Sequence, residues 1–155
     1  MITQKDILEE INHLLKEKYG YKVYGIEVSE GYKKPSFFVD LRLTGQTDES
    51  ANMVRQSYNV SIVYFQRNVN EIDCLDKAEG IRQCLISKDV KNTKKKMMLK
   101  VKDRYISVEG FETGYIGRNN NILQINFDLA FTTLNQPAQE GELIKAVKVN
   151  QEMEE

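Results

Sequence analysis

The sequence predicts an α+β fold, with two helices packed on one face of a largely antiparallel, mixed sheet. Two segments carry apolar residues at helical spacing, and they cover about residues 3–19 and 70–86. Several other segments alternate apolar and polar residues, which is typical of strands with one buried face. Gly, Pro and Asn stand between these segments, where the chain must turn. We expect one domain over residues 1–134 and an extended or disordered C-terminal tail over residues 135–155.

The first helix is predicted over about residues 3–19. Thr3 and Asp6 have the spacing of a capping box, in which each side chain satisfies a backbone N–H group of the other residue. Gly20 suits the left-handed position that often ends a helix. The apolar stripe of this helix consists of Ile7, Leu8, Ile11, Leu14 and Leu15.

A pair of strands is predicted next, Val23–Val28 and Ser36–Leu43, with a turn over Ser29–Pro35 between them. The turn contains a glycine and a proline, the two residue types that most often interrupt regular structure. Alternate residues of the second strand share its buried face, which consists of Phe37, Val39, Leu41 and Leu43.

A polar loop is predicted over Thr44–Asn52, followed by a strand over Met53–Phe65. Thirteen residues is long for one strand. We therefore expect the first half of this strand, together with the polar loop, to form a β-hairpin that projects from the domain. The buried face of its second half consists of Tyr58, Val60, Ile62 and Tyr64.

The second half of the chain contains the other predicted helix, Asn70–Ile86, and three further strands. The strands cover Met97–Val101, Tyr105–Phe111 and Ile122–Thr133, and the last of them has the most regular alternation in the sequence. The buried stripe of the helix is predicted as Ile72, Leu75, Ile81 and Leu85. The buried face of the last strand is predicted as Leu123, Ile125, Phe127, Leu129 and Phe131.

The overall composition is that of an ordinary soluble domain, with 41% hydrophobic and 29% charged residues and a net charge of −1. A molecule that is nearly neutral has no overall electrostatic attraction to nucleic acid or to a membrane. The first residues lack the basic start and apolar run of a signal peptide, and no apolar run is long enough to cross a membrane. We expect a protein that is not exported and has no membrane partner.

No sequence motif for catalysis, cofactor binding or metal binding is present. The phosphate loop, the dinucleotide fingerprint, HExxH and paired cysteine motifs are all absent. His13 is the only histidine, and we interpret it as a surface residue of the first helix. Asp73 and Asp76 could form a carboxylate pair, although acidic residues are favoured near a helix start in any case. Cys74 and Cys84 are ten residues apart on one predicted helix, about 15 Å, which is too far for a disulfide. We expect a protein that is not an enzyme, without catalytic residues, cofactors or metal ions.

The segment Lys88–Arg104 is strongly basic, with eight positive and two negative side chains. Three interpretations remain open for it: a solvated loop, a contact with an acidic protein surface, or a nucleic-acid contact. Stacking on nucleic acid would favour interleaved aromatic residues, but only Tyr105 is close by.

The block from Tyr24 to Phe65 resembles a family of phage tail terminator proteins from phages, prophages and phage-tail-like particles of Gram-positive bacteria. The likeness covers roughly residues 1–133 and includes the first helix and the strand Ile122–Phe131. Its specificity comes from a combination of strand and turn residues. In the block these are Tyr24-Gly25, Glu27-Val28, Gly31-Tyr32, Pro35, Phe37-Phe38-Val39, Arg55, Ser57-Tyr58, Val60, Ile62 and Tyr64-Phe65.

The resemblance implies a structural protein of the virion or tail-like particle, assembled in the cytoplasm of the bacterial host. Its subunits would form a homohexameric ring on the finished end of the tail tube. The ring would end polymerisation of the tube and offer an attachment surface to the neck or head. The implied partners are further copies of the chain, the tail tube protein, the tail sheath in contractile tails, and neck or connector proteins. DNA would pass through the lumen without specific binding.

Contacts with these partners are expected on the projecting hairpin and in the basic segment. Two alternatives stay open: a head–tail connector or completion ring on the portal side, and a nucleic-acid-binding module that uses Lys88–Arg104. The candidate contact residues are Thr44, Gln46, Asp48, Met53, Arg55, Lys94, Lys95 and Lys96.

Overall fold

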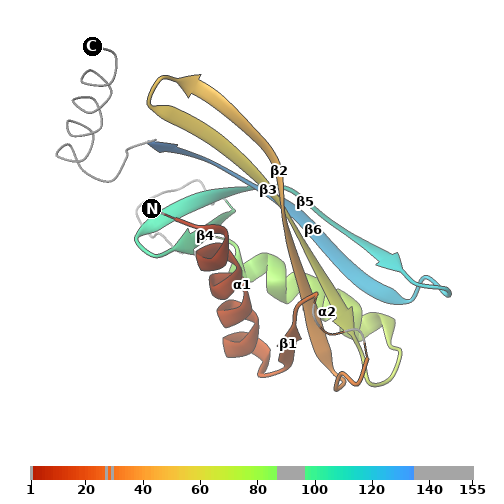
Figure 1. The fold of residues 1–155 in the computed structure, drawn as a ribbon. Coiled ribbons are helices and arrows are strands. Elements are labelled where there is room, and N and C mark those ends of the chain that lie inside the picture. Colours follow the sequence, from red (N-terminus) through yellow and green to blue (C-terminus); the bar gives the residue numbers. More distant parts are fainter. Residues whose placement is uncertain (1, 27, 29, 87–96, 135–155) are drawn as a thin grey trace, which may run out of the picture.

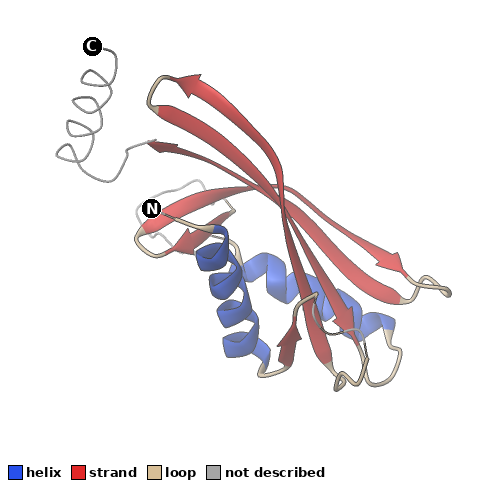
Figure 2. Cartoon of the chain, viewed as in Figure 1, coloured by secondary structure: helices blue, strands red, loops and turns tan. Residues whose placement is uncertain are grey.

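A computed structural model describes residues 2–26, 28, 30–86 and 97–134 of the chain. These residues form one mixed six-stranded sheet with both helices on one of its faces, which confirms the predicted α+β class (Figures 1 and 2). The strand order is β1-β2-β3-β6-β5-β4, and only β1 and β2 run parallel. The elements are α1 Gln4–Tyr19, β1 Lys22–Tyr24, β2 Ser36–Ser50, β3 Met53–Phe65, α2 Glu71–Cys84, β4 Met98–Val101, β5 Arg104–Ile116 and β6 Ile122–Leu134.

Helix α1 begins and ends as the sequence predicts. The Thr3 hydroxyl accepts a hydrogen bond from the Asp6 N–H at 3.2 Å, and the Thr3 N–H donates to the Asp6 carboxylate at 2.9 Å. Gly20 adopts a left-handed conformation, with φ +70°, and its N–H bonds to the carbonyl of Lys16. Ile7, Ile11 and Leu15 are buried against the sheet, while the other two residues of the predicted stripe are half-buried.

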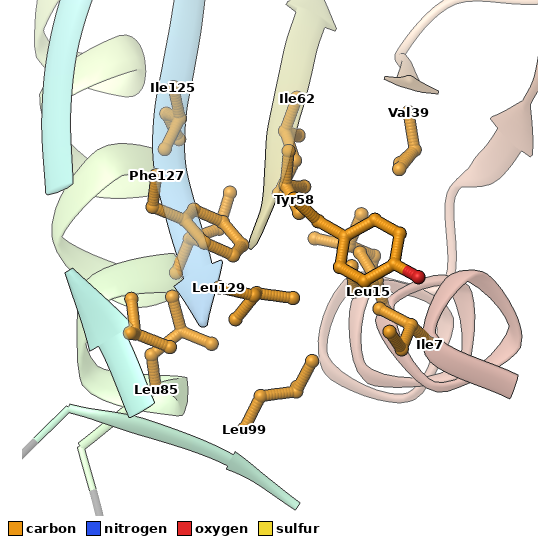
Figure 3. Close-up of a cluster of buried hydrophobic side chains, with 14 of the residues drawn as sticks. Ile7, Leu15, Val39, Tyr58, Ile62, Leu85, Leu99, Ile125, Phe127 and Leu129 are labelled. Carbon is orange, nitrogen blue, oxygen red and sulfur yellow. The ribbon is translucent and has the colours of Figure 1, made fainter. Parts of the chain in front are cut away.

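The hydrophobic core lies between the sheet and the two helices (Figure 3). The predicted faces of β3 and β6 are both confirmed, because every residue assigned to them is at most 5% exposed. On β2 the prediction holds only near the start of the strand. Phe37 and Val39 are buried, Leu41 is half-buried, and Leu43 is 45% exposed. From there on the strand has left the layer that the helices cover (Figure 1).

The projecting hairpin is present, but the predicted loop over Thr44–Asn52 is wrong. Strand β2 continues to Ser50, and the turn consists of Ala51 and Asn52 alone. Every residue from Arg42 to Met53 is exposed, so neither face of this part of the hairpin requires apolar side chains. The polar composition that suggested a loop therefore reflects solvent on both faces of a regular ladder.

Two other strand boundaries also differ from the prediction. Strand β1 covers only Lys22–Tyr24 rather than Val23–Val28. Strand β5 continues to Ile116 instead of ending at Phe111. Gly110 does not end the strand, because it takes part in a bulge after which the pairing with β6 resumes. A bulge accommodates one extra residue without ending the pairing. The predicted turn between β5 and β6 is confirmed, with Asn120 in a left-handed conformation at φ 49°.

The predicted buried stripe of α2 is wrong at two of its four positions. Ile72 is 77% exposed and Leu75 is 57% exposed, whereas Ile81 and Leu85 are buried as expected. The helix instead faces the sheet with Cys74, Lys77, Ile81 and Leu85, which also have helical spacing. This orientation is favoured because three aromatic rings, from α1, the loop before β1 and β3, surround Lys77, and α2 itself supplies a carboxylate partner.

A matched pair of alanine variants tests the orientation of α2. Ile81→Ala removes a side chain that is 3% exposed, and we expect it to lower the free energy of unfolding by about 2–5 kcal/mol. Ile72→Ala removes the same atoms from the solvent face and should cost less than about 0.5 kcal/mol. Urea denaturation of the two variants measures both values. Equal losses would mean that α2 does not present this face to the sheet.

Candidate assembly surface

The predicted contact residues of the hairpin all lie on one projecting element. We call residues 44–56 of the β2–β3 hairpin the arm; it extends past both helices at one end of the sheet (Figure 1, orange and gold). Thr44, Gln46, Asp48, Met53 and Arg55 are all exposed on it. The prediction that Lys94, Lys95 and Lys96 join this surface falls outside the described residues.

The arm is held together mainly by its backbone ladder. Gln46 pairs with Gln56, and the amide of Gln56 donates to the Gln46 side chain at 3.4 Å. On its other side the arm pairs with the end of β6, where Met53 lies opposite Leu134. Both of these side chains are exposed, at 38% and 59%. The arm therefore presents polar side chains and one apolar cross-strand pair that a neighbouring protein could cover.

A second exposed apolar surface lies on α2 and was missed by the sequence reasoning. Ile72 and Leu75 are three residues apart on the solvent face of the helix, and the exposed Val69 precedes them. The signal that could have revealed this surface is the second helical spacing in the same segment, which places Cys74 and Ile81 inward. A hollow of about 330 Å³ lies between the start of α2 and the end of the β5–β6 hairpin, and Val69 is the one residue of the apolar surface that lines it. The hollow is lined by Gln66, Val69, Asn70, Glu71, Cys74, Tyr115, Asn120 and Asn121.

A partly buried ion pair within α2 lies against the tyrosines beneath this surface. The Lys77 side chain is 8% exposed, and its ammonium donates to the Asp73 carboxylate at 2.8 Å. The same ammonium lies 5.2–5.6 Å from the ring centres of Tyr19, Tyr21 and Tyr64. Aromatic faces attract a cation, so the rings replace part of the water that Lys77 loses. We call these five residues the lysine cluster.

Two further hydrogen bonds complete the coordination of Asp73. The Tyr64 hydroxyl donates to it at 2.7 Å and the Gln66 amide at 2.8 Å. Burial raises the pKa of Asp73, but the hydrogen bonds from Lys77, Gln66 and Tyr64 outweigh that effect and bring the pKa to about 2. Burial and the hydrogen bond to Asp73 both raise the pKa of Tyr64. Asp76, the other member of the suggested carboxylate pair, is exposed and takes no part in these hydrogen bonds.

The other residues considered for catalysis or metal binding have surroundings that do not suit those roles. His13 lies on the exposed face of α1, with its Nε2 3.2 Å from Glu17. Burial raises the pKa of the Cys74 thiol, which is the opposite of the shift that activates a nucleophile. Among the described residues, no three His, Cys, Asp or Glu side chains are grouped to hold a metal ion. Neither described helix is both long and apolar enough to span a membrane.

The sequence matches one protein family over most of its length. Residues 6–141 match the family described as "Phage tail terminator protein". None of the curated proteins matches the chain at a significant level. One solved structure that matches covers 90% of this chain and 100% of its own length, with 8% sequence identity and a TM-score of 0.47. A likeness at that level carries no argument about function.

The family match includes the whole Tyr24–Phe65 block and so confirms the resemblance stated for it. Proteins of this family are structural components of the tail of a virion or tail particle, where they interact with other tail proteins. The chain belongs to the phage tail terminator family.

Proposed function

We propose that the chain closes into a homohexameric ring on the end of a tail tube, where it stops polymerisation. The ring then offers its outer surface to the neck or head, and in contractile tails to the last ring of the sheath. The observation that carries this proposal is the family match over residues 6–141. It favours a terminator over the two alternatives, a connector on the portal side and a nucleic-acid-binding module.

The shape of the described residues supports a ring subunit. A cyclic ring needs two different surfaces on each subunit, one for each neighbour. The arm lies at one end of the sheet, and the turn between β5 and β6 lies at the opposite end (Figure 1). We assign contacts with a neighbour or with the tube to Thr44, Gln46, Asp48, Met53 and Arg55 of the arm. Lys94, Lys95 and Lys96 are proposed as a second contact region.

The near-neutral charge of the subunit suits a ring through which DNA must pass. Each phosphate neutralised by a lysine or arginine strengthens binding and would slow the passage of DNA. With a net charge of −1, six copies would carry no large positive field in total. This supports a lumen that lets DNA pass without holding it.

The direct test is to polymerise tail tube protein in the presence of the purified chain. We expect shorter tubes of narrow length distribution, with a ring visible at one end by cryo-electron microscopy. Mass photometry should show the free ring or its assembly on tubes. The connector alternative predicts copurification with filled heads and no effect on tube length. A chain that stays monomeric and leaves tube growth unchanged would refute the proposal.

A further inference from the structure

The two outer strands of the sheet are each covered over only part of their length. Strand β1 pairs with β2 only along Ser36–Phe38, and β4 pairs with β5 only along Arg104–Ser107. No other strand of the described part of the chain pairs with the outer side of residues 39–50 or 109–116. We call these segments the β2 free edge and the β5 free edge.

The direction of the backbone groups on the β5 free edge follows from one hydrogen bond and one bulge. The Val108 N–H donates a hydrogen bond to the carbonyl of Met97 at 3.0 Å, so the backbone N–H and C=O groups of Val108 are directed away from β6. Directions alternate along a strand, so Glu109 points toward β6. After the bulge, Glu112 pairs with Asn126, two positions from Asp128, the partner of Glu109. The backbone groups of Glu112 are therefore also directed toward β6. Thr113 therefore directs its N–H and C=O groups outward.

The same alternation defines the outward groups of the β2 free edge. Asp128 directs its backbone N–H and C=O groups toward β5, so those of the next residue, Leu129, are directed toward β3. The partner of Leu129 on β3 is Tyr58, whose backbone groups are therefore directed toward β6. Ser57 then points to β2, where it pairs with Gly45. The next residue, Gln46, directs its N–H and C=O groups away from β3, into the space beside the arm.

Neither free edge carries lysine or proline, although both carry acidic side chains. Monomeric sheet proteins protect such edges with charged residues, above all lysine, with proline or with bulges. Residues 39–50 and 109–116 contain no lysine and no proline. Both edges do contain bulges, but regular runs remain at Gly45–Asp48 and Glu112–Ile116. Runs of four and five residues lie within the usual length of a strand in a sheet.

We infer that the β2 free edge of one copy pairs with the β5 free edge of the next copy, so that one sheet continues from subunit to subunit. The two edges lie on opposite sides of the sheet and at its opposite ends, so one molecule cannot pair them with each other (Figure 1). β2 and β5 run in opposite directions within the sheet. A neighbour in the same orientation therefore adds β2 antiparallel to β5.

This pairing is heterologous, because each copy uses two different edges. Every added copy leaves one edge of each kind unpaired, and only closure of a ring satisfies both. The inference rests on the proposed ring and identifies which surfaces form its subunit contact. It also explains why the arm is a regular ladder, since only an extended strand can present a row of backbone groups to a neighbour.

Proline at an outward position tests each edge separately. Gln46→Pro and Thr113→Pro each remove one outward N–H group and place a ring in the path of the neighbouring strand, but leave the internal ladder bonds intact. We expect each variant to stay folded by circular dichroism and to weaken self-association at least tenfold in mass photometry. Gln46→Ala and Thr113→Ala keep the N–H group and should assemble like the wild type.

Mixing the two proline variants gives the sharpest readout. Gln46→Pro keeps an intact β5 edge and Thr113→Pro keeps an intact β2 edge, so the mixture should form a 1:1 dimer and no larger species. If both proline variants form rings as readily as the wild type, the inference is overturned and the proposed function still stands. Loss of assembly in Gln46→Pro alone would indicate pairing of two β2 edges and would also overturn it. A wild type that assembles neither alone nor on tail tubes would refute both proposals.

Discussion

A chain with a shortened arm should fold normally but fail to cap tail tubes. The change replaces residues 48–54 by Asn-Gly, so that the pair Thr47 and Arg55 closes a two-residue hairpin. The expected loss of stability is at most about 2 kcal/mol, because Val54 is the one buried residue removed. We expect tubes to grow to uncontrolled length in the presence of this variant, as measured by electron microscopy.

The control for this experiment keeps the length of the arm. Replacing only the turn residues Ala51 and Asn52 by Asn-Gly introduces the same turn chemistry while leaving both strands of the arm complete. This control should limit tube length like the wild type. Normal capping by the shortened variant would show that the arm contacts neither a neighbour nor the tube.

Breaking the lysine cluster should cause the largest loss of stability of any single polar substitution. Asp73→Ala removes the partner of a buried ammonium, and we expect it to cost about 3–5 kcal/mol in the free energy of unfolding. Lys77→Met should cost less, because Asp73 keeps its hydrogen bonds from Tyr64 and Gln66. Asp76→Ala, on the exposed face of the same helix, is the matched control and should cost less than about 0.5 kcal/mol.

The pH dependence of stability separates the charge of Asp73 from its packing. Its pKa is about 2 in the folded protein, below the ordinary value of 3.8. The stabilisation it provides is therefore complete above the unfolded pKa and disappears as the pH falls through about 2. We expect the stability difference between wild type and Asp73→Asn to shrink between pH 4 and about 2. A difference that stays constant over this range would mean that the carboxylate charge is not what stabilises the cluster.

The local signals in the sequence were sufficient for the elements whose surroundings are simple. The caps of helix α1 are formed by residues three or four positions apart, and its apolar stripe follows the helical repeat, so both can be recognised from the local sequence. Strand β6 is covered on one face along its length, so its alternation matches burial residue by residue. The strand and turn pattern of Tyr24–Phe65 was enough to suggest the family.

The orientation of α2 and the extent of the arm were decided by the tertiary structure. Two helical spacings compete in α2, and the choice depends on the three tyrosines that meet Lys77 from α1, the loop before β1, and β3. Residues 44–52 of the arm have the composition of a loop because a ladder with solvent on both faces needs no apolar residues. Its pairing comes from backbone hydrogen bonds, which every non-proline residue can make, so side-chain type does not encode it. The local pattern of residues therefore indicated the family and most elements, while long-range pairing decided which surfaces of the described residues stay exposed.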